Sequence, residues 1–204
     1  DVCSSDLELT YQPPLDWETL FAYLKARALR GVEAVEGNRY LRTAASGQVG
    51  WLAVEPSPSA SVLRVELSAS LASESPAILA RLERVFDLAA EPQRIAAQLG
   101  SLATNPGLRV PGAFDGFEIA VRAILGQQVS VKSATTLAGR FIATFGQPVE
   151  TPFPALTHLT PTAKRVAESN IDEIASLGII AARAKSILAL AETIASKKIF
   201  LEPG

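Results

Sequence analysis

Cysteine, histidine and methionine are almost missing from this chain of 204 residues. It has one cysteine, Cys3, one histidine, His158, and no methionine. A single cysteine excludes a disulfide within the chain and a cysteine-based metal cage. A single histidine gives no basis for a histidine-rich metal site or a serine–histidine–aspartate triad. We therefore expect no bound metal ion.

Long apolar runs and a secretory leader are missing as well. No apolar run approaches the roughly 20 residues that a membrane span needs, and residues 1–6 fit neither a leader nor a helix or strand pattern. We expect a cytoplasmic protein with no membrane partner, whose fold begins near residue 7. The lack of a starting methionine and the final Pro203–Gly204 turn signal indicate a piece of a longer protein.

Neither sign of charge predominates, since the formal net charge is −2. The distribution is uneven: residues 1–90 carry 8 basic and 12 acidic side chains, whereas residues 91–204 carry 11 and 9. The second part is slightly positive, as a surface that faces phosphates would be. With 48% apolar residues, the chain can bury a sizeable core and form two domains.

Strand patterns dominate the first third of the chain. Asp16 is a predicted N-cap for a helix that begins at Trp17, and Trp17 and Trp51 are expected to anchor the core. Strands are predicted at residues 7–11, 32–35, 40–44, 47–54 and 62–67. This pattern fits an antiparallel sheet backed by helices, an α+β domain over residues 7–75.

Helical patterns fill the rest, so we predict an all-α domain over residues 76–204. Asp115, Ser130 or Ser133, and Thr160 before Pro161 are predicted to begin helices. The expected helical ranges are 77–88, 92–99, 115–125, 130–145, short segments after 160, and 181–197.

Two adjacent glutamines, Gln127 and Gln128, lie at the predicted junction of two apolar helices. Gly126 before them would let the backbone break sharply and approach a phosphate. Their amides suit base edges or the space left by an extruded base, and the helix that begins near Ser130 could hold a phosphate at its N-terminus. The alternative is a helix–turn–helix corner with solvated glutamines.

Several segments along the chain form an ordered set of motifs. They are residues 11–17 (YQPPLDW), 84–88 (RVFDL), 106–112 (PGLRVPG), 115–118 (DGFE), 121–131 (VRAILGQQVSV) and 177–185. Together, from about residue 7 to the end of the chain, they resemble the bacterial 3-methyladenine DNA glycosylase II (AlkA-type) family of the helix-hairpin-helix superfamily.

This resemblance implies a monomer that flips alkylated bases out of double-stranded DNA and hydrolyses their glycosidic bond without a cofactor. The loop Gly126–Ser130 would enter the minor groove, with Gln128 as the wedge and Gln127 beside it. Tyr23 would line the aromatic pocket for a cationic alkylated purine; simple core packing is its alternative.

The family's glycine-rich hairpin and catalytic aspartate are expected after Gly204. Asp16, Asp115 and Asp172 look like helix caps, so no catalytic residue is assigned and the chain itself is expected to be inactive. A helical domain without further helices is expected to expose Ile187, Leu190 and Ile194 and to aggregate.

Other polar residues have structural explanations. Lys197 and Lys198 complement a helix dipole, His158 is expected in a loop, and Arg27 and Arg30 could reach DNA or the rim of a pocket.

Three rival functions stay open. They are a non-catalytic DNA-binding or regulatory module, removal of oxidised purines on the same scaffold, and an interaction domain with an accidental glutamine pair.

Overall fold

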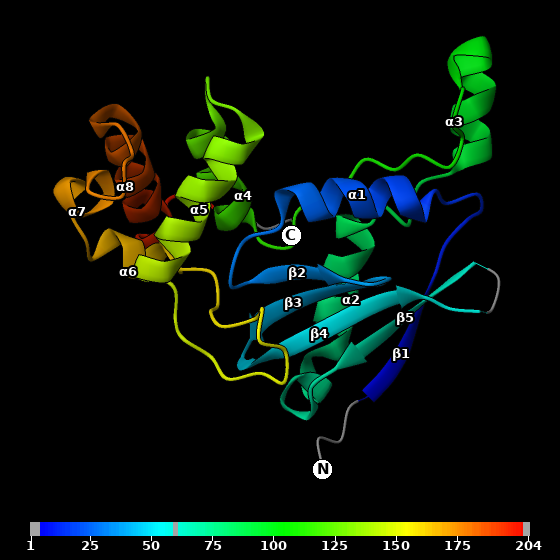
Figure 1. Cartoon of the computed structure of the whole chain (residues 1–204), viewed down its shortest axis with the longest axis horizontal. Coiled ribbons are helices and arrows are strands. Elements are labelled where there is room, and N and C mark those ends of the chain that lie inside the picture. Colours follow the sequence, from blue (N-terminus) through cyan, green and yellow to red (C-terminus); the bar gives the residue numbers. More distant parts are fainter. Residues whose placement is uncertain (1–4, 59–60, 202–204) are drawn as a thin grey trace. The chain divides into compact units, whose positions relative to one another are not determined.

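The computed structural model describes residues 5–58 and 61–201, which form two compact units (Figure 1). The first unit holds the described residues up to Ala26 together with Glu33–Phe114. The second holds Arg27–Val32 and the chain from Asp115 onward. The division expected between residues 75 and 76 differs from this one, because α2 (Ser75–Val85) is buried against the strands.

A five-stranded antiparallel sheet organises the first unit. The order is β1-β5-β4-β3-β2, with bounds Ser5–Thr10 (β1), Glu33–Glu36 (β2), Arg39–Ser46 (β3), Gln48–Pro56 (β4) and Val62–Leu67 (β5). The predicted strands and the α+β class are confirmed. β1 begins earlier than expected, since Ser5 pairs with Leu67. Ser5 and Asp6 therefore belong to the sheet, while residues 1–4 lie outside the described residues.

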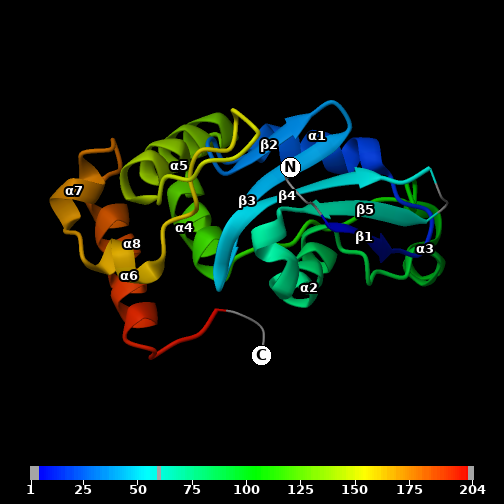
Figure 2. The ribbon, with the colours of Figure 1, turned by 90° about the horizontal axis from the view of Figure 1, so that it is seen from below.

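The core of this unit lies on one face of the sheet. Alternation along β5 buries Leu63, Val65 and Leu67, and α1 (Trp17–Arg27) and α2 pack there (Figure 1, Figure 2). Asp16 caps α1 as predicted, because its Oδ1 accepts from the Thr19 amide at 3.0 Å.

Trp17 packs against this core, and Trp51 of β4 is buried outside this cluster. The Trp17 ring lies 4.7 Å from Phe21 and 5.5 Å from Phe86 between ring centroids, and Trp51 is buried. The burial of Trp51 leaves it no open face for stacking on a nucleic-acid base.

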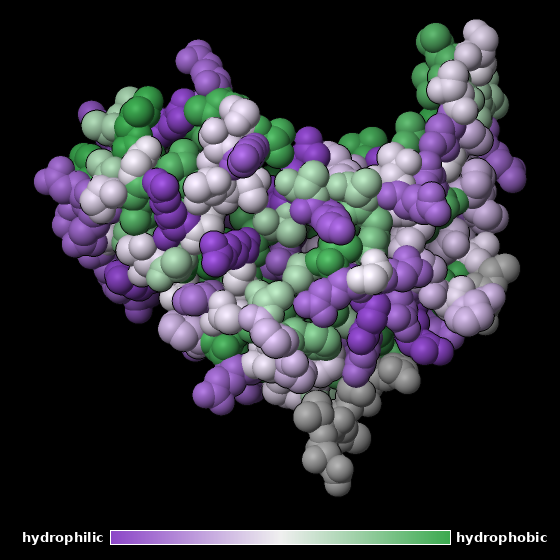
Figure 3. Space-filling model, viewed as in Figure 1, coloured by the Kyte–Doolittle hydropathy of each residue, from purple (hydrophilic) through white to green (hydrophobic). Residues whose placement is uncertain are grey.

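The short helix η1 (Ala69–Glu74) links the sheet to α2, and α3 (Pro92–Leu99) and η2 (Gly100–Leu102) follow. Only Pro92 of α3 is buried, and Ile95 and Leu99 are exposed. Figure 3 shows hydrophobic side chains on the surface of this helix. None of the helices in the described residues combines the length and apolarity required to cross a membrane.

The second unit is helical, with an apolar core. Its helices are α4 (Gly116–Gly126), α5 (Val131–Phe145), α6 (Ala163–Ala167), α7 (Ile171–Ala175) and α8 (Ala181–Ala195). The expected exposure of Ile187, Leu190 and Ile194 is wrong, because α8 packs against α4, α6 and α7. Ile187 is fully buried, and Leu190 and Ile194 are partly buried.

The N-caps of this unit follow the predictions in part. The predicted caps Asp115 and Ser130 are confirmed by bonds from Glu118 N and Ser133 N. Thr162, rather than Thr160, caps α6. Asn170, rather than Asp172, caps α7, since only its side chain can reach the amide of Glu173 three residues on.

One buried polar cluster joins the edge strand β2 to its neighbour β3 in the first unit. The Glu33 carboxylate accepts from Arg42 Nη1 at 2.7 Å and from the Tyr40 hydroxyl at 2.5 Å. The Arg42 guanidinium also lies 4.4 Å from the ring centroid of Phe114, the last residue of this unit. The Glu33 carboxylate thus pairs with a cation and a phenol where water is excluded.

Alkaline pH should weaken the first unit through Tyr40. Burial and the adjacent Glu33 carboxylate raise the pKa of the Tyr40 phenol well above its ordinary value of about 10. The unfolded chain therefore loses this proton first, so stability present below about pH 10 falls by up to ~1.4 kcal/mol per pH unit above it. Urea unfolding between about pH 7 and 11 measures this.

Tyr40→Phe should flatten that alkaline decline and cost about 1 kcal/mol at pH 7 through the lost hydrogen bond. Tyr23→Phe, at an exposed position, is the matched control and should retain wild-type stability at pH 7. An equally steep alkaline decline in Tyr40→Phe would show that another group controls it.

Candidate functional site

The turn between α4 and α5 presents both glutamines to solvent. Gly126 is the last residue of α4, Ser130 is the N-cap of α5, and Gln127 and Gln128 between them are exposed. A reversal this short leaves the side chains no room in the core of the second unit. The sequence placed the pair at a helix junction, and the structure places it there.

The backbone break occurs at a different residue from the expected one. Gln128 has a φ of 55°, in the left-handed region, whereas Gly126 continues the helix and would have open space for a Cβ. A left-handed conformation costs a non-glycine residue about 1–2 kcal/mol. A side chain therefore occupies a position where glycine would be less strained.

Hydrogen bonds from α8 and within the start of α5 hold the turn. Arg183 of α8 donates through Nη2 to the Gln127 carbonyl oxygen. Ser130 Oγ accepts from Ser133 N at 3.2 Å and lies 2.9 Å from Ser133 Oγ. The backbone of the turn is thereby fixed at both ends, and no local pattern could indicate Arg183, which lies 56 residues further along the chain.

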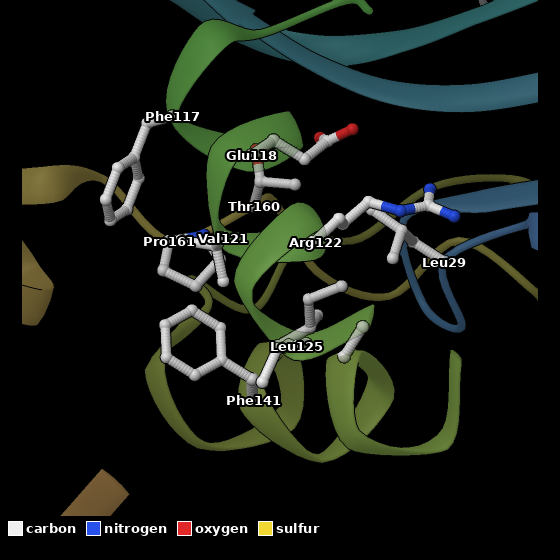
Figure 4. Close-up of a pocket in the computed structure, with 11 residues that line it drawn as sticks. Leu29, Phe117, Glu118, Val121, Arg122, Leu125, Phe141, Thr160 and Pro161 are labelled. Carbon is white, nitrogen blue, oxygen red and sulfur yellow. The ribbon is translucent and has the colours of Figure 1, made fainter. Parts of the chain in front are cut away.

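A small apolar pocket lies behind α4. Figure 4 shows Phe117 on one side of α4 and the side chains of Glu118 and Arg122 extended on the other, with Leu125 and Phe141 below. Its volume is about 20 Å³, close to the ~10–15 Å³ that one water requires. It cannot hold a nucleic-acid base.

Tyr23 lies in α1, in the first unit. Its neighbour Leu20 is buried in the core, but Tyr23 is 41% exposed and does not belong to the core cluster. Core packing, the alternative explanation of this residue, is thus not what the structure shows. Tyr23 is thus a largely exposed aromatic residue on α1.

The aspartates with described side chains have structural partners or helix positions. Asp16 and Asp115 cap helices, Asp87 accepts from the amide of Val110 at 3.1 Å, and Asp172 lies in the first turn of α7. Bonds from the backbone and side chain of Thr19, and then from Asn105, lower the pKa of Asp16. This keeps Asp16 ionised, so it is not a candidate general acid.

His158 lies in a loop, as predicted. Its Nδ1 is 2.9 Å from Thr157 Oγ1, and its amide donates to the Gly31 carbonyl oxygen at 2.9 Å. Within residues 5–58 and 61–201, no three histidine, cysteine, aspartate or glutamate side chains gather where they could hold a metal ion.

Family models match the chain in two consecutive stretches. Residues 6–115 match the AlkA N-terminal domain. Residues 121–202 match the HhH-GPD superfamily of base excision DNA repair proteins. The junction between the two matches falls at the junction between the two compact units.

Individual proteins with similar sequences have related names. The chain is 38% identical over 185 residues to DNA-3-methyladenine glycosylase 2 of Escherichia coli, covering 90% of this chain and 65% of that protein. It is 34% identical over 209 residues to a probable bifunctional transcriptional activator/DNA repair enzyme AlkA of Mycobacterium tuberculosis, covering 97% of this chain and 40% of that protein. It therefore spans less than two thirds of either relative.

A solved structure has the same fold. The 3-methyladenine DNA-glycosylase from Archaeoglobus fulgidus superposes with a TM-score of 0.75 at 20% identity, covering 91% of this chain and 66% of that one.

Replacing Gln128 by glycine should stabilise the protein. Glycine relieves the left-handed strain, and after its own entropic cost a gain of about 0.5–1 kcal/mol in the free energy of unfolding remains. Gln127→Gly, one residue earlier at a φ of −61°, is the matched control and should lose stability. Urea unfolding compares the two; a destabilised Gln128→Gly would mean that the side chain contributes packing here.

Proposed function

Since this chain belongs to the AlkA family, with the N-terminal domain followed by the HhH-GPD repair domain, we propose that it acts in base excision repair of alkylated DNA. The substrate is double-stranded DNA that carries 3-methyladenine-like bases, and the reaction of the whole protein is hydrolysis of the N-glycosidic bond. The protein binds DNA as a monomer and uses no cofactor. The observation that carries this proposal is the exposed, backbone-fixed glutamine pair at the α4–α5 turn of a chain in this family.

The turn Gly126–Ser130 enters the minor groove in this proposal. Gln128 fills the space that an extruded base leaves, and Gln127 hydrogen-bonds the neighbouring base edges. Gly126 allows close approach of the backbone, and the N-terminus of α5 at Ser130 favours a nearby phosphate. The fixed backbone supports this role, because a wedge that is already ordered loses less entropy on binding.

Tyr23 receives the extruded base. An alkylated purine such as 3-methyladenine is cationic, and a π face attracts a cation by about 0.5–2 kcal/mol. The exposure of Tyr23 supports this assignment, since a ring in the core could not contact a ligand.

Gln128→Ala should weaken binding to duplex DNA by roughly 2- to 12-fold, the equivalent of one hydrogen bond of ~0.5–1.5 kcal/mol. Fluorescence anisotropy at low and high salt measures this, and the loss should persist at high salt because no charge is removed. Gln93→Ala, on the exposed surface of α3, is the control. Unchanged affinity of Gln128→Ala at both salt concentrations would remove the wedge from the proposal.

Tyr23→Leu should reduce the preference for a duplex with a cationic methylated purine over an undamaged duplex by about 2- to 30-fold, the loss of the cation–π attraction. Tyr23→Phe keeps a π face and should retain most of the preference. Competition binding with the two duplexes measures it. Equal preferences in the leucine and phenylalanine variants would place the base elsewhere.

A second candidate is a non-catalytic DNA-binding or regulatory module. It is supported by the 34% identity to a relative that is named as a probable bifunctional transcriptional activator/DNA repair enzyme. Both candidates bind DNA through the same turn. Incubation of the whole protein, rather than of these 204 residues alone, with a methylated duplex separates them, because only a glycosylase releases free base.

A further inference from the structure

We propose that Arg183 of α8 is a positioning residue for the glutamine turn. Its bond to the Gln127 carbonyl oxygen keeps the peptide group between Gln127 and Gln128 in one of two orientations. The proposal rests on the proposed function, since it concerns how the turn that contacts DNA is held. In the held orientation the carbonyl oxygen faces α8, and in the rotated one it faces away.

The backbone angles of the two glutamines are those of a type II turn. Gln127 has a φ of −61° and a ψ of 122°, and Gln128 has a φ of 55°. The central residues of a type II turn have a φ of about −60° and a ψ of about 120°, followed by a φ of about 80°. A type I turn differs by rotation of the peptide between these residues, which gives the second one a negative φ. Because this rotation leaves the Cα atoms almost in place, both orientations fit the same short reversal.

The left-handed backbone at Gln128 by itself favours the rotated peptide. Its strain corresponds to a factor of roughly 5 to 30 in population. Asp87 and Lys197 are left-handed as well, but each directly follows the end of a helix. There the next amide donates back into the helix, at 2.9 and 3.1 Å respectively. Gln128 instead follows the extended backbone of Gln127, so its conformation needs support from outside the turn.

Arg183 supplies this support. Its Nη2 donates to the Gln127 carbonyl oxygen. Since a peptide group is planar, holding this oxygen fixes ψ of Gln127 and φ of Gln128 together. A hydrogen bond from a charged donor favours the state that forms it by roughly 10- to 150-fold. This exceeds the strain, so the held orientation predominates while the bond is present.

The position of Arg183 in α8 agrees with a role outside its own helix. Arg183 lies in the first turn of α8, where the positive end of the helix dipole disfavours a cation. The next residue, Ala184, is buried in the core of the second unit, whereas Arg183 is only partly buried. The bond to the turn offsets this unfavourable position.

The second unit contains a matched turn without the strain. Arg140 Nη1 donates to the Leu177 carbonyl oxygen at 2.9 Å, and the next residue, Gly178, has a φ of 89°. Both turns thus combine an arginine, a carbonyl oxygen and a left-handed residue directly after it. Glycine adopts this conformation readily. We therefore expect the Leu177 turn to keep its orientation without its arginine, and the glutamine turn to lose it.

The orientation of the peptide decides which backbone group meets the DNA. The C=O and N–H of a trans peptide point in opposite directions. A carbonyl bound by Arg183 therefore directs the Gln128 N–H away from α8, where it can donate to a phosphate or a base. The rotated peptide would present a carbonyl oxygen instead, which repels phosphates. Only the held fraction of the protein binds, so the apparent affinity falls with that fraction.

Proton NOEs in the isotope-labelled protein test the orientation without DNA. The held turn brings Gln127 Hα close to the Gln128 amide proton, whereas the rotated turn brings the two amide protons together. Arg183→Met keeps the stem, removes the donor and should exchange the first NOE for the second. Arg140→Met is the matched control and should leave the NOEs at Gly178 unchanged. Circular dichroism confirms the fold, and Arg183→Gln, whose amide ends short of the carbonyl, replaces the methionine variant if that variant does not fold.

Duplex binding by fluorescence anisotropy tests the role in recognition. Arg183→Met should weaken binding by roughly 5- to 30-fold, because the strain is no longer offset. In a Gln128→Gly background, where glycine removes the strain, the same change should weaken binding by less than about 2-fold. An equal loss in both backgrounds, with a salt slope lower by about 1, would assign Arg183 to a direct phosphate contact and overturn the proposal.

Unchanged NOEs in Arg183→Met would also overturn it. The proposed function would stand in that case if Gln128→Ala still weakens DNA binding. A wild-type protein that binds no DNA overturns both.

Discussion

The reversal of the chain between α4 and α5 is the constraint on which the candidate site depends. Both helices are apolar on the sides that pack in the second unit, and only residues 127–130 separate them. A turn this short needs one residue in a left-handed conformation, an N-cap for the second helix and an external anchor for its carbonyl groups. Gln128, Ser130 and Arg183 meet these needs. The exposure of the glutamine amides follows from the turn itself.

Local features of this protein could be predicted from its sequence, because local chemistry decides them. The strands follow alternating apolar residues, and Asp16, Asp115 and Ser130 cap helices whose first amides lie within reach of their side chains. The predicted N-cap of α6, Thr160, was wrong by two residues. Thr160 and Thr162 carry the same hydroxyl group, and only packing decides which of them caps the helix.

Features that join distant segments could not be predicted in this way. The bond from Arg122 to the carbonyl of Arg27 spans 95 residues, and the bond from Arg183 to Gln127 spans 56. The burial of Ile187 likewise depends on three other helices. Phe114, the last residue of the first unit, packs its ring against the guanidinium of Arg42 from β3. In each case a side chain meets its partner only after the fold has formed. The family resemblance therefore suggested the site residues, but not the distant side chains that hold them in place.

The left-handed backbone at Gln128 also limits how this family member can diverge. β-Branched side chains are strained in that conformation, so valine, isoleucine and threonine are disfavoured at the tip whatever their chemistry. Unbranched residues, asparagine and glycine are tolerated there without refolding the turn. A single mutation can therefore replace the polar side chain at position 128 by an apolar one or by glycine, while the helices on either side keep their positions. The turn is a place where binding preference can change faster than the fold that presents it.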